Sequence, residues 1–310
     1  MNKNEIINKL NNSKLIAHRL GYKMTEYPEN SSASIEAIFN NKELLDSCSG
    51  FELDICFTKD HIPVVIHDKY IDDISNEKGK VKSYTLEDLK KLSFTFRKSN
   101  NIKDDFTFKI LSLDELLDYF QNKKYLLKEK IIKIETKEMF FLNKKNLEVL
   151  ASILNNYKSI ANNLVHLSYY PTNLIYLKEI QIKNNFQVTK TDLLCDYNLP
   201  ILISKISKSI DSISLRIKTA DMRKLNKKNN FKVNKQVFFD NILMKLSNVI
   251  SDKTLSYAIG KYKTVGVYVL NNEKEITTFS KLISKEFFDC NWMNITYTTD
   301  NPLYIKKLRT

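Results

Sequence analysis

Two acidic residues, two positions apart, are the first sign of chemistry in this chain. Glu52 and Asp54 lie in GFELDICF, residues 50–57, an apolar run that predicts a β-strand. Because side chains alternate along a strand, both carboxylates point to the same side and repel each other unless a cation relieves them. Ca²⁺ and Mg²⁺ prefer carboxylate oxygens, so the pair indicates a site for a hard divalent cation. The plainer alternative puts both residues on the exposed face of an edge strand.

A third carboxylate and an ammonium group repeat this spacing further along. In KIIKIETK, Glu135 and Lys137 lie two apart near the end of another predicted strand, 130–136. Three carboxylates suit a hard cation, and an ammonium group beside them suits an anionic substrate. Together with Arg19, whose guanidinium matches phosphate geometry, Lys137 is predicted to hold the nonbridging oxygens of a phosphodiester.

Two of the four histidines lie where predicted strands end. His18 follows LIA and directly precedes Arg19, and His67 follows the apolar run PVVI. Imidazole titrates near neutral pH, so one histidine can activate a nucleophile while the other protonates a leaving alcohol. His61, in a predicted turn, and His166, within LVHLS, are interpreted as structural.

These residues must be brought together by a fold in which strands and helices alternate. Helical patterns such as SSASIEAIFNNKELLD, with Ser31 or Ser32 as the expected cap, separate the strand-like runs. The predicted strands are 15–18, 50–57, 63–67, 130–136, 164–168, 211–217, 264–270 and 292–298. The alternation fits a doubly wound sheet or an eight-unit β/α barrel, whose usual size is about 250 residues. Because no glycine-rich phosphate loop follows an early strand, the sequence favours an α/β protein with a (β/α)8 TIM barrel.

The barrel is expected to be a single domain, residues 1–310, with a small insertion at about 68–112. Only five Gly and five Pro occur, and no linker divides the chain. Residues 93–112 are polar and irregular, which is typical of an insertion rather than a barrel element. Phe94, Phe96 and Phe106 are expected to make core contacts, with a lipid-facing rim as the alternative.

The composition is that of a globular protein with an anionic partner. Hydrophobic residues make up 43% of the 310, and the formal net charge of +13 favours a phosphate ester, a nucleic acid or a membrane surface. Because the lysines are dispersed and no basic segment alternates with aromatics, we expect a small-molecule partner and no nucleic acid. The four separated cysteines are interpreted as reduced thiols. With neither a signal peptide nor a transmembrane run, the sequence predicts a cytoplasmic location and leaves the oligomeric state open.

The order of the motifs resembles that of the glycerophosphodiester phosphodiesterases, a family of metal-dependent β/α-barrel enzymes. Between residue 15 and about residue 137 the chain has H-R, P-E-N, E-L-D, T-K-D, P-V-V-I-H-D, a spaced Gly79, T-L-E-D-L-K-K-L, S-L-D-E-L-L and I-E-T-K. Beyond that the resemblance is an outline, carried by LSYYPTNLIYLKEI, VGVYVLNNEKEI and TTDNP. It implies hydrolysis of a glycerophosphodiester to glycerol 3-phosphate and an alcohol, as part of lipid and glycerol metabolism.

The resemblance also implies a role for each candidate residue. The implied acid/base pair is His18 and His67. The implied ligands of the metal ion, Ca²⁺ or Mg²⁺, are Glu52, Asp54 and Glu135. The implied contacts to phosphate and to the rest of the substrate come from Arg19, Lys137, Glu29 and Tyr268. In such enzymes a glycerol hydroxyl can attack first, giving a cyclic phosphate that water then opens, and the sequence does not choose between this route and direct hydrolysis.

Three positions depart from the family pattern. The family has glycine directly after His-Arg, whereas this chain has Leu20 and then Gly21. Asp-Ile-Ser at 73–75 replaces an Arg-Thr-Thr-like stretch, and Tyr268 stands where tryptophan is frequent. We therefore expect differences in the phosphate loop, in the leaving-group pocket and in the packing of the alcohol.

Two other functions are compatible with the sequence. One is a phosphodiesterase or lyase that acts on another head group, such as a lysophospholipid, a sugar phosphodiester or a teichoic-acid-like polymer. The other is a catalytically silent barrel that binds nucleic acid or another anionic polymer through its positive surface. Retention of the acid, base and metal set makes the silent barrel the weaker alternative.

Overall fold

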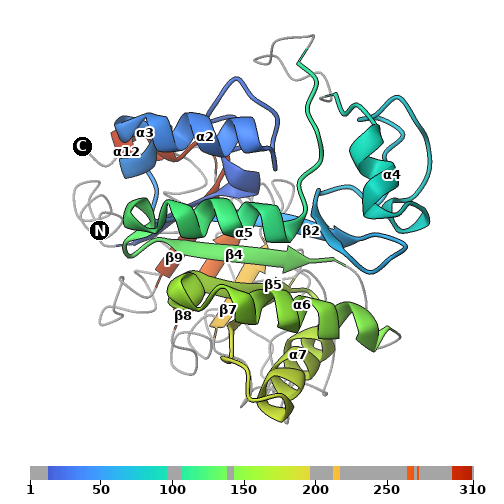
Figure 1. Ribbon diagram of the computed structural model, residues 1–310. Coiled ribbons are helices and arrows are strands. Elements are labelled where there is room, and N and C mark those ends of the chain that lie inside the picture. The colour runs from blue at the N-terminus through green and yellow to red at the C-terminus, as the bar shows by residue number, and fades with distance from the viewer. Residues whose placement is uncertain are drawn as a thin grey trace, which may run out of the picture.

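Eight parallel strands form a closed ring in the computed structural model of the chain (Figure 1). The structure describes residues 13–95, 106–137, 143–195, 212–216, 264–268, 271 and 295–308. At positions 171, 195, 212–216, 264–268, 295 and 308 it describes the backbone alone. The ring closes because β1 pairs in parallel with β2 on one side and with β9 on the other. The predicted TIM barrel is therefore confirmed.

The barrel strands run in the order β1, β2, β4, β5, β6, β7, β8, β9 around the ring. Their bounds are β1 Lys14–Ala17, β2 Gly50–Phe57, β4 Ile131–Thr136, β5 Leu164–Ser168, β6 Lys190–Cys195, β7 Ser212–Arg216, β8 Thr264–Tyr268 and β9 Ile295–Thr299. A further strand, β3 Pro63–Val65, pairs antiparallel with β2 and lies outside the ring. The predicted strand 63–67 is thus shorter than expected and is not a barrel strand.

Helices follow or connect these strands. The described α-helices are α2 Ser32–Asn40, α3 Lys42–Asp46, α4 Leu86–Lys91, α5 Leu113–Asn122, α6 Lys144–Asn156, α7 Pro171–Lys183 and α12 Pro302–Leu308. The described 3₁₀ segments are η1 His18–Leu20, η2 Val81–Ser83, η3 Lys124–Leu127 and η5 Lys158–Asn163. In the part of the chain that the structure covers, no helix combines the length and apolar character that a bilayer crossing requires.

Strand β6 is absent from the predicted strands because polar and charged residues make up its first half. Its sequence KTDLLC places Asp192 on the strand, and that carboxylate is buried inside the barrel. Asp192 Oδ2 lies 2.7 Å from Lys133 Nζ of β4, so an ion pair offsets the cost of burying both charges. With Lys190, Thr191 and Asp192 at its start, the strand leaves an apolar run of only Leu-Leu-Cys, which is too short to indicate a strand.

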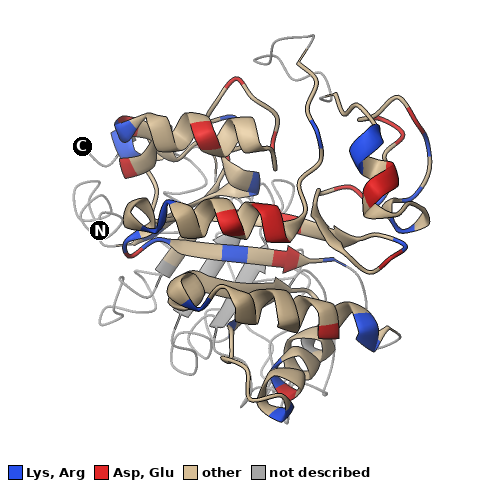
Figure 2. Cartoon of the chain, in the orientation of Figure 1, with Lys and Arg blue, Asp and Glu red and all other residues tan. Residues whose placement is uncertain are grey.

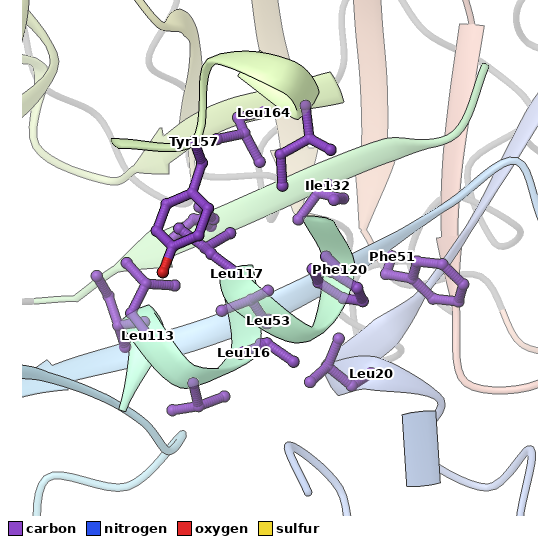
Figure 3. Packing of buried hydrophobic residues seen from close by; sticks show 14 of the residues in the cluster. Leu20, Phe51, Leu53, Leu113, Leu116, Leu117, Phe120, Ile132, Tyr157 and Leu164 are labelled. Atoms are coloured by element: carbon purple, nitrogen blue, oxygen red, sulfur yellow. The ribbon is translucent and has the colours of Figure 1, made fainter. Parts of the chain in front are cut away.

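A core of apolar side chains joins helix α5 to the outer faces of β2 and β4. Leu116, Leu117 and Phe120 of α5 point toward Leu53 of β2 and Ile132 of β4 (Figure 3). All five side chains are buried, and burial of each contributes about 2 kcal/mol. Because alternate residues of a strand point to opposite faces, the core fixes which face of β2 and β4 is left for the barrel interior.

The sequence itself starts α5 through the residue before its first turn, Ser112. Ser112 Oγ accepts a hydrogen bond from the Glu115 N–H, and a Glu115 carboxylate oxygen accepts one from the Ser112 N–H. Such a capping box satisfies two backbone donors at the first turn. Ser31 caps α2 by accepting a hydrogen bond from the Ser34 N–H through its side chain, which confirms one of the two expected caps.

The described part of the insertion between β3 and α5 lies beside the barrel and contains α4 (Figure 1). Phe94 is fully buried in a second core with residues such as Leu89, so it makes the expected core contacts and no lipid-facing rim. Phe106 packs edge-on against Tyr27 with 5.3 Å between the ring centroids. Phe96 lies outside the described residues.

Candidate active site

Three carboxylates meet inside the barrel at the carboxyl ends of two neighbouring strands. The register of β2 and β4 pairs Asp54 with Glu135, and Glu52 precedes Asp54 by two residues on the same face. Ligand-type oxygens of the three residues lie within 4.8 Å of one another, and the residues are at most 4% exposed. Among the residues that the structure describes, none forms a hydrogen bond with the buried Glu52 Oε1. A desolvated all-oxygen set with an uncommitted oxygen fits a hard divalent cation.

The carboxyl groups of this cluster differ in pKa because their surroundings differ. Burial, together with the charges of Asp54 and Glu135, raises the pKa of Glu52 well above its usual value. Burial also raises the pKa of Glu135, although Lys137 opposes that shift. Burial would likewise raise the pKa of Asp54, but Lys137 and the other cationic groups nearby hold it below its usual value. A bound divalent cation relieves the repulsion that raises the pKa of Glu52.

Two cations border the carboxylate cluster. Lys137 Nζ lies 2.9 Å from Asp54 Oδ1 and 3.4 Å from Glu135 Oε1. Arg19 Nη1 donates to both carboxylate oxygens of Glu29, at 2.9 and 3.0 Å, and Arg19 Nε lies 3.7 Å from Asp54 Oδ2. Burial alone would lower the pKa of each cation, yet the neighbouring carboxylates raise both values. Both side chains therefore stay charged and available to an anion.

Two imidazoles complete the arrangement. His18 Nδ1 lies 2.7 Å from Asp300 Oδ1, and His67 Nδ1 lies 2.9 Å from Asp68 Oδ1. Both rings are close enough to Asp54 to help lower the pKa of its carboxyl group. Since a carboxylate engages Nδ1 in each ring, proton transfer to or from a substrate falls to Nε2.

The backbone after β1 is strained where it enters the site. Arg19 and Leu20 have φ angles of 48° and 54°, and Gly21 follows at 96°. This left-handed conformation costs a non-glycine residue about 1 kcal/mol. The Arg19 N–H donates to Glu52 Oε2 at 2.9 Å, Ser34 Oγ donates to the Leu20 carbonyl at 2.9 Å, and the Leu20 side chain is fully buried. These contacts compensate for the backbone strain at Leu20, a position where a glycine would adopt the same conformation without strain.

A cavity of about 310 Å³ opens beside the cluster. Arg19, Glu29, His67 and Asp68 contribute charged and polar groups to its lining. The rest of the lining is apolar and comes from β3, from the residue after it and from the insertion. These apolar residues are Val65, Ile66, Ile74, Phe94, Phe108 and Ile110. Ile74 belongs to the 73–75 stretch that departs from the family pattern, so that departure falls on the wall of the cavity.

The structure gathers every predicted site residue except Tyr268, whose side chain lies outside the described residues. The two histidines interpreted as structural lie elsewhere. His61 Nδ1 contacts Asn146 Oδ1 at 2.8 Å, and His166 Nε2 contacts Thr136 Oγ1 at 2.9 Å. His166 is fully buried, and burial lowers its pKa to about 3, so it is a neutral structural residue. The Cys48 and Cys56 thiols are reduced and buried, as expected.

Sequence reasoning assigned no role to several residues that support the site. Asn30 Nδ2 donates to Asp54 Oδ2 at 3.1 Å, and Asp68 and Asp300 engage the two site histidines. Asn271 in turn contacts Asp300. A signal was present for three of the four, since Asn30 ends P-E-N, Asp68 adjoins His67, and Asp300 lies in TTDNP.

The fold and the site define a β/α-barrel protein with a carboxylate cluster, two imidazoles and two cations at the carboxyl ends of its strands. The profile of the glycerophosphoryl diester phosphodiesterase family matches residues 21–198, more than half of the chain. The chain belongs to this family.

Individual relatives agree with the assignment. A glycerophosphodiester phosphodiesterase of Bacillus altitudinis is 40% identical over 79 residues, which are 26% of this chain and 29% of that protein. The match thus spans less than a third of the curated relative. A putative glycerophosphoryl diester phosphodiesterase of Silicibacter pomeroyi has a similar crystal structure, with a TM-score of 0.66, 13% identity, and coverage of 96% of this chain and 92% of that one. An Oleispira antarctica phosphodiesterase, solved in complex with the product sn-glycerol-3-phosphate, has a TM-score of 0.61, 14% identity, and coverage of 95% and 96%. At these identities the two structures show a shared fold.

Proposed function

We propose that this protein hydrolyses glycerophosphodiesters to glycerol 3-phosphate and an alcohol in a metal-dependent reaction. The observation that carries the proposal is the buried cluster of Glu52, Asp54 and Glu135 with two imidazoles beside it. Membership of the family supports the reaction type. The sn-glycerol-3-phosphate bound to the Oleispira antarctica phosphodiesterase supports glycerol phosphate as the product side of the substrate.

The three carboxylates are the proposed ligands of a Ca²⁺ or Mg²⁺ ion. Their oxygens are hard donors, and the buried Glu52 Oε1, which has no hydrogen bond to any described residue, would gain a partner in the cation. When bound, the ion supplies positive charge that polarises a phosphoryl oxygen and stabilises charge developing in the transition state.

Arg19 and Lys137 are the proposed phosphate contacts. Both are cations at the edge of the carboxylate cluster, with side chains about one-fifth exposed at 20% and 19%. Glu29 accepts from one guanidinium nitrogen, Arg19 Nη1, through both carboxylate oxygens and so holds the Arg19 side chain at this place. The nonbridging oxygens of a diester would then lie between a planar donor and a point charge.

The two histidines are the proposed acid and base. One Nε2 takes the proton of the attacking hydroxyl as its oxygen bonds to phosphorus, and the other Nε2 gives a proton to the alcohol oxygen as its bond to phosphorus breaks. Such positioned proton transfer contributes about 10²–10⁴-fold to a rate. Either water or a glycerol hydroxyl can be the nucleophile, and the second choice passes through a cyclic phosphate that water opens.

The apolar wall of the cavity favours a second candidate substrate. A lysophospholipid carries a phosphodiester and an acyl chain, and the partly exposed side chains of Ile74 and Phe108 offer apolar surface beside the phosphate contacts. Acidic and basic residues are interspersed on the described helices, as Figure 2 shows. This mixture of charges disfavours the alternative of a barrel that binds an anionic polymer. A small-molecule substrate and a cytoplasmic location stay our predictions from the sequence.

The experiment that tests the function is a substrate panel with purified protein. Glycerophosphocholine, glycerophosphoethanolamine and lysophosphatidylcholine are incubated with Ca²⁺ or Mg²⁺, and glycerol 3-phosphate and free choline are measured by coupled enzymes. We expect glycerol 3-phosphate from the first two substrates. If choline is released from lysophosphatidylcholine and neither glycerophosphodiester is cleaved, a lysophospholipid replaces glycerophosphodiesters as the proposed substrate. No product from any of the three diesters would overturn both proposals.

A further inference from the structure

The side chain that holds His18 comes from the opposite end of the chain. Asp300 directly follows β9, and β9 pairs with β1, the strand that His18 directly follows. Ring closure therefore places the His18 imidazole beside the Asp300 carboxylate, with 2.7 Å between Nδ1 and Oδ1. Both side chains are largely buried, at 15% and 10% exposure. In such surroundings a charged hydrogen bond is stronger than it is in water.

Asp300 is itself fixed in place. Asn271 Nδ2 donates to the second carboxylate oxygen, Oδ2, at 2.7 Å. The same amide group accepts, through Oδ1, from the Asp300 N–H at 2.9 Å and from Thr299 Oγ1 at 3.2 Å. Lys23 Nζ lies 3.5 Å from Asp300 Oδ2. Asn271 and Lys23 thus hold Asp300 Oδ2, while Asp300 Oδ1 faces the His18 imidazole.

The other ring nitrogen of His18 faces the carboxylate cluster. His18 Nε2 lies 3.8 Å from Glu52 Oε2, whereas Nδ1 is turned to Asp300. A carboxylate at Nδ1 keeps the proton on that nitrogen, so Nε2 carries the lone pair toward the reacting groups. The same carboxylate stabilises the imidazolium that forms when Nε2 accepts a proton.

We propose that Asp300, oriented by Asn271, is a positioning residue that sets the tautomer and direction of His18. The inference rests on the proposed function of His18 as an acid or base. Asp300 stays unprotonated throughout: the proton that Nε2 takes leaves again from Nε2, and the Nδ1 proton stays on the ring. His67 has its own partner in Asp68, the next residue in the chain, so the two histidines are oriented independently.

The tautomer can be read without any turnover. The chain has four histidines, so long-range ¹H–¹⁵N spectra of ¹⁵N-histidine-labelled protein are simple, and the His18 signals are those that His18→Gln removes. We expect a neutral His18 protonated on Nδ1 in the wild type and a shift toward protonation on Nε2 in Asp300→Ala. An unchanged His18 tautomer in Asp300→Ala would overturn the inference.

Kinetics separate positioning from simple structural support. We expect Asp300→Asn to lower kcat about 100-fold with KM within about twofold, and Asn271→Ala to lower kcat about tenfold. Asp118→Asn, which removes a helix-surface carboxylate bonded only locally to Asn122, is the control and should match the wild type. The double variant His18→Ala/Asp300→Asn should be no slower than His18→Ala, because Asp300 acts through His18.

The outcomes distinguish this inference from the proposed function. If the wild type cleaves no glycerophosphodiester, the proposed function falls, while the ¹⁵N spectra still decide whether Asp300 sets the His18 tautomer. If the wild type is active and Asp300→Asn keeps full kcat, or if the two substitutions have additive effects, Asp300 has only a structural role. Thermal melts of each variant check that the loss of kcat does not come from unfolding.

Discussion

The barrel mouth, meaning the carboxyl ends of the strands that carry the carboxylate cluster, and the insertion meet at one cavity but are built differently. At the mouth, Asp54 and Glu135 are register partners on adjacent strands, so backbone pairing fixes their separation. The insertion holds Phe94 and Phe108 through an isolated bridge and a small core of its own. The proposed chemistry therefore depends on the ring, whereas the wall of the cavity can change its sequence without disturbing the ring.

The histidines should give the largest effects at the mouth. We expect His18→Ala and His67→Ala each to lower kcat about 10²–10⁴-fold while the melting temperature stays close to that of the wild type, since neither ring belongs to the core. His61→Ala, which removes an imidazole that contacts Asn146, is the matched control for turnover. Steady-state kinetics and circular dichroism melts measure both quantities, and full activity in either site variant contradicts the assigned role.

Loss of one cluster carboxylate should separate activity from stability. Glu52→Gln is expected to lower kcat about 10²–10³-fold, the usual cost of removing one preorganised electrostatic group. In the presence of chelator the same variant should melt higher than the wild type, because burial and like charges raise the pKa of Glu52.

Added metal provides the discriminating control for this variant. Ca²⁺ or Mg²⁺ should raise the melting temperature of the wild type and have a much smaller effect on Glu52→Gln. Glu148→Gln, at a half-exposed position on α6, should behave as the wild type does. A full metal-induced shift in Glu52→Gln would mean that the ion lies elsewhere.

A substitution in the insertion should have a smaller effect of a different kind. Phe108→Ala removes apolar surface from the wall of the cavity, so we expect KM for the preferred diester to rise about tenfold, or about 1.4 kcal/mol, with kcat little changed. Tyr125→Ala removes an aromatic ring that is 71% exposed and serves as the control. A large loss of kcat in Phe108→Ala would break the distinction between mouth and insertion.

His166 should affect stability alone. Burial lowers its folded-state pKa to about 3, below the ordinary 6.5, so the unfolded chain binds more protons and stability falls as pH drops below about 6.5. The loss from this residue is about 2 kcal/mol between pH 7 and pH 5. His166→Gln should lack this part of the pH dependence in urea unfolding, with kcat near the wild-type value. Identical pH slopes would contradict the neutral, buried assignment.

The sequence predicted the mouth of the barrel better than the ring that carries it. Glu52, Asp54 and Glu135 could be placed together because strand alternation and the ends of parallel strands follow from local pattern. Strand β6 escaped prediction because its apolar run is short, and the Lys133 partner that stabilises its buried Asp192 lies on another strand.

Contacts that depend on ring closure could not be predicted at all. Asp300 and His18 are 282 residues apart and meet only because β9 pairs with β1. The left-handed backbone at Leu20 could not be predicted either, because no glycine marks the position. Burial of the Leu20 side chain and the hydrogen bond from Ser34 offset its strain. Local sequence therefore indicates which residues carry charge, and the closed fold decides which partners orient them.

The most direct test of the central claim is the metal dependence of glycerophosphodiester cleavage. Wild-type protein treated with chelator is mixed with glycerophosphocholine, and phosphorus NMR follows the diester before and after excess Ca²⁺ or Mg²⁺ is added. We expect no conversion with chelator and release of glycerol 3-phosphate once metal is restored, with far slower release in Glu52→Gln at the same metal concentration. Equal rates with chelator and with metal would contradict the central claim.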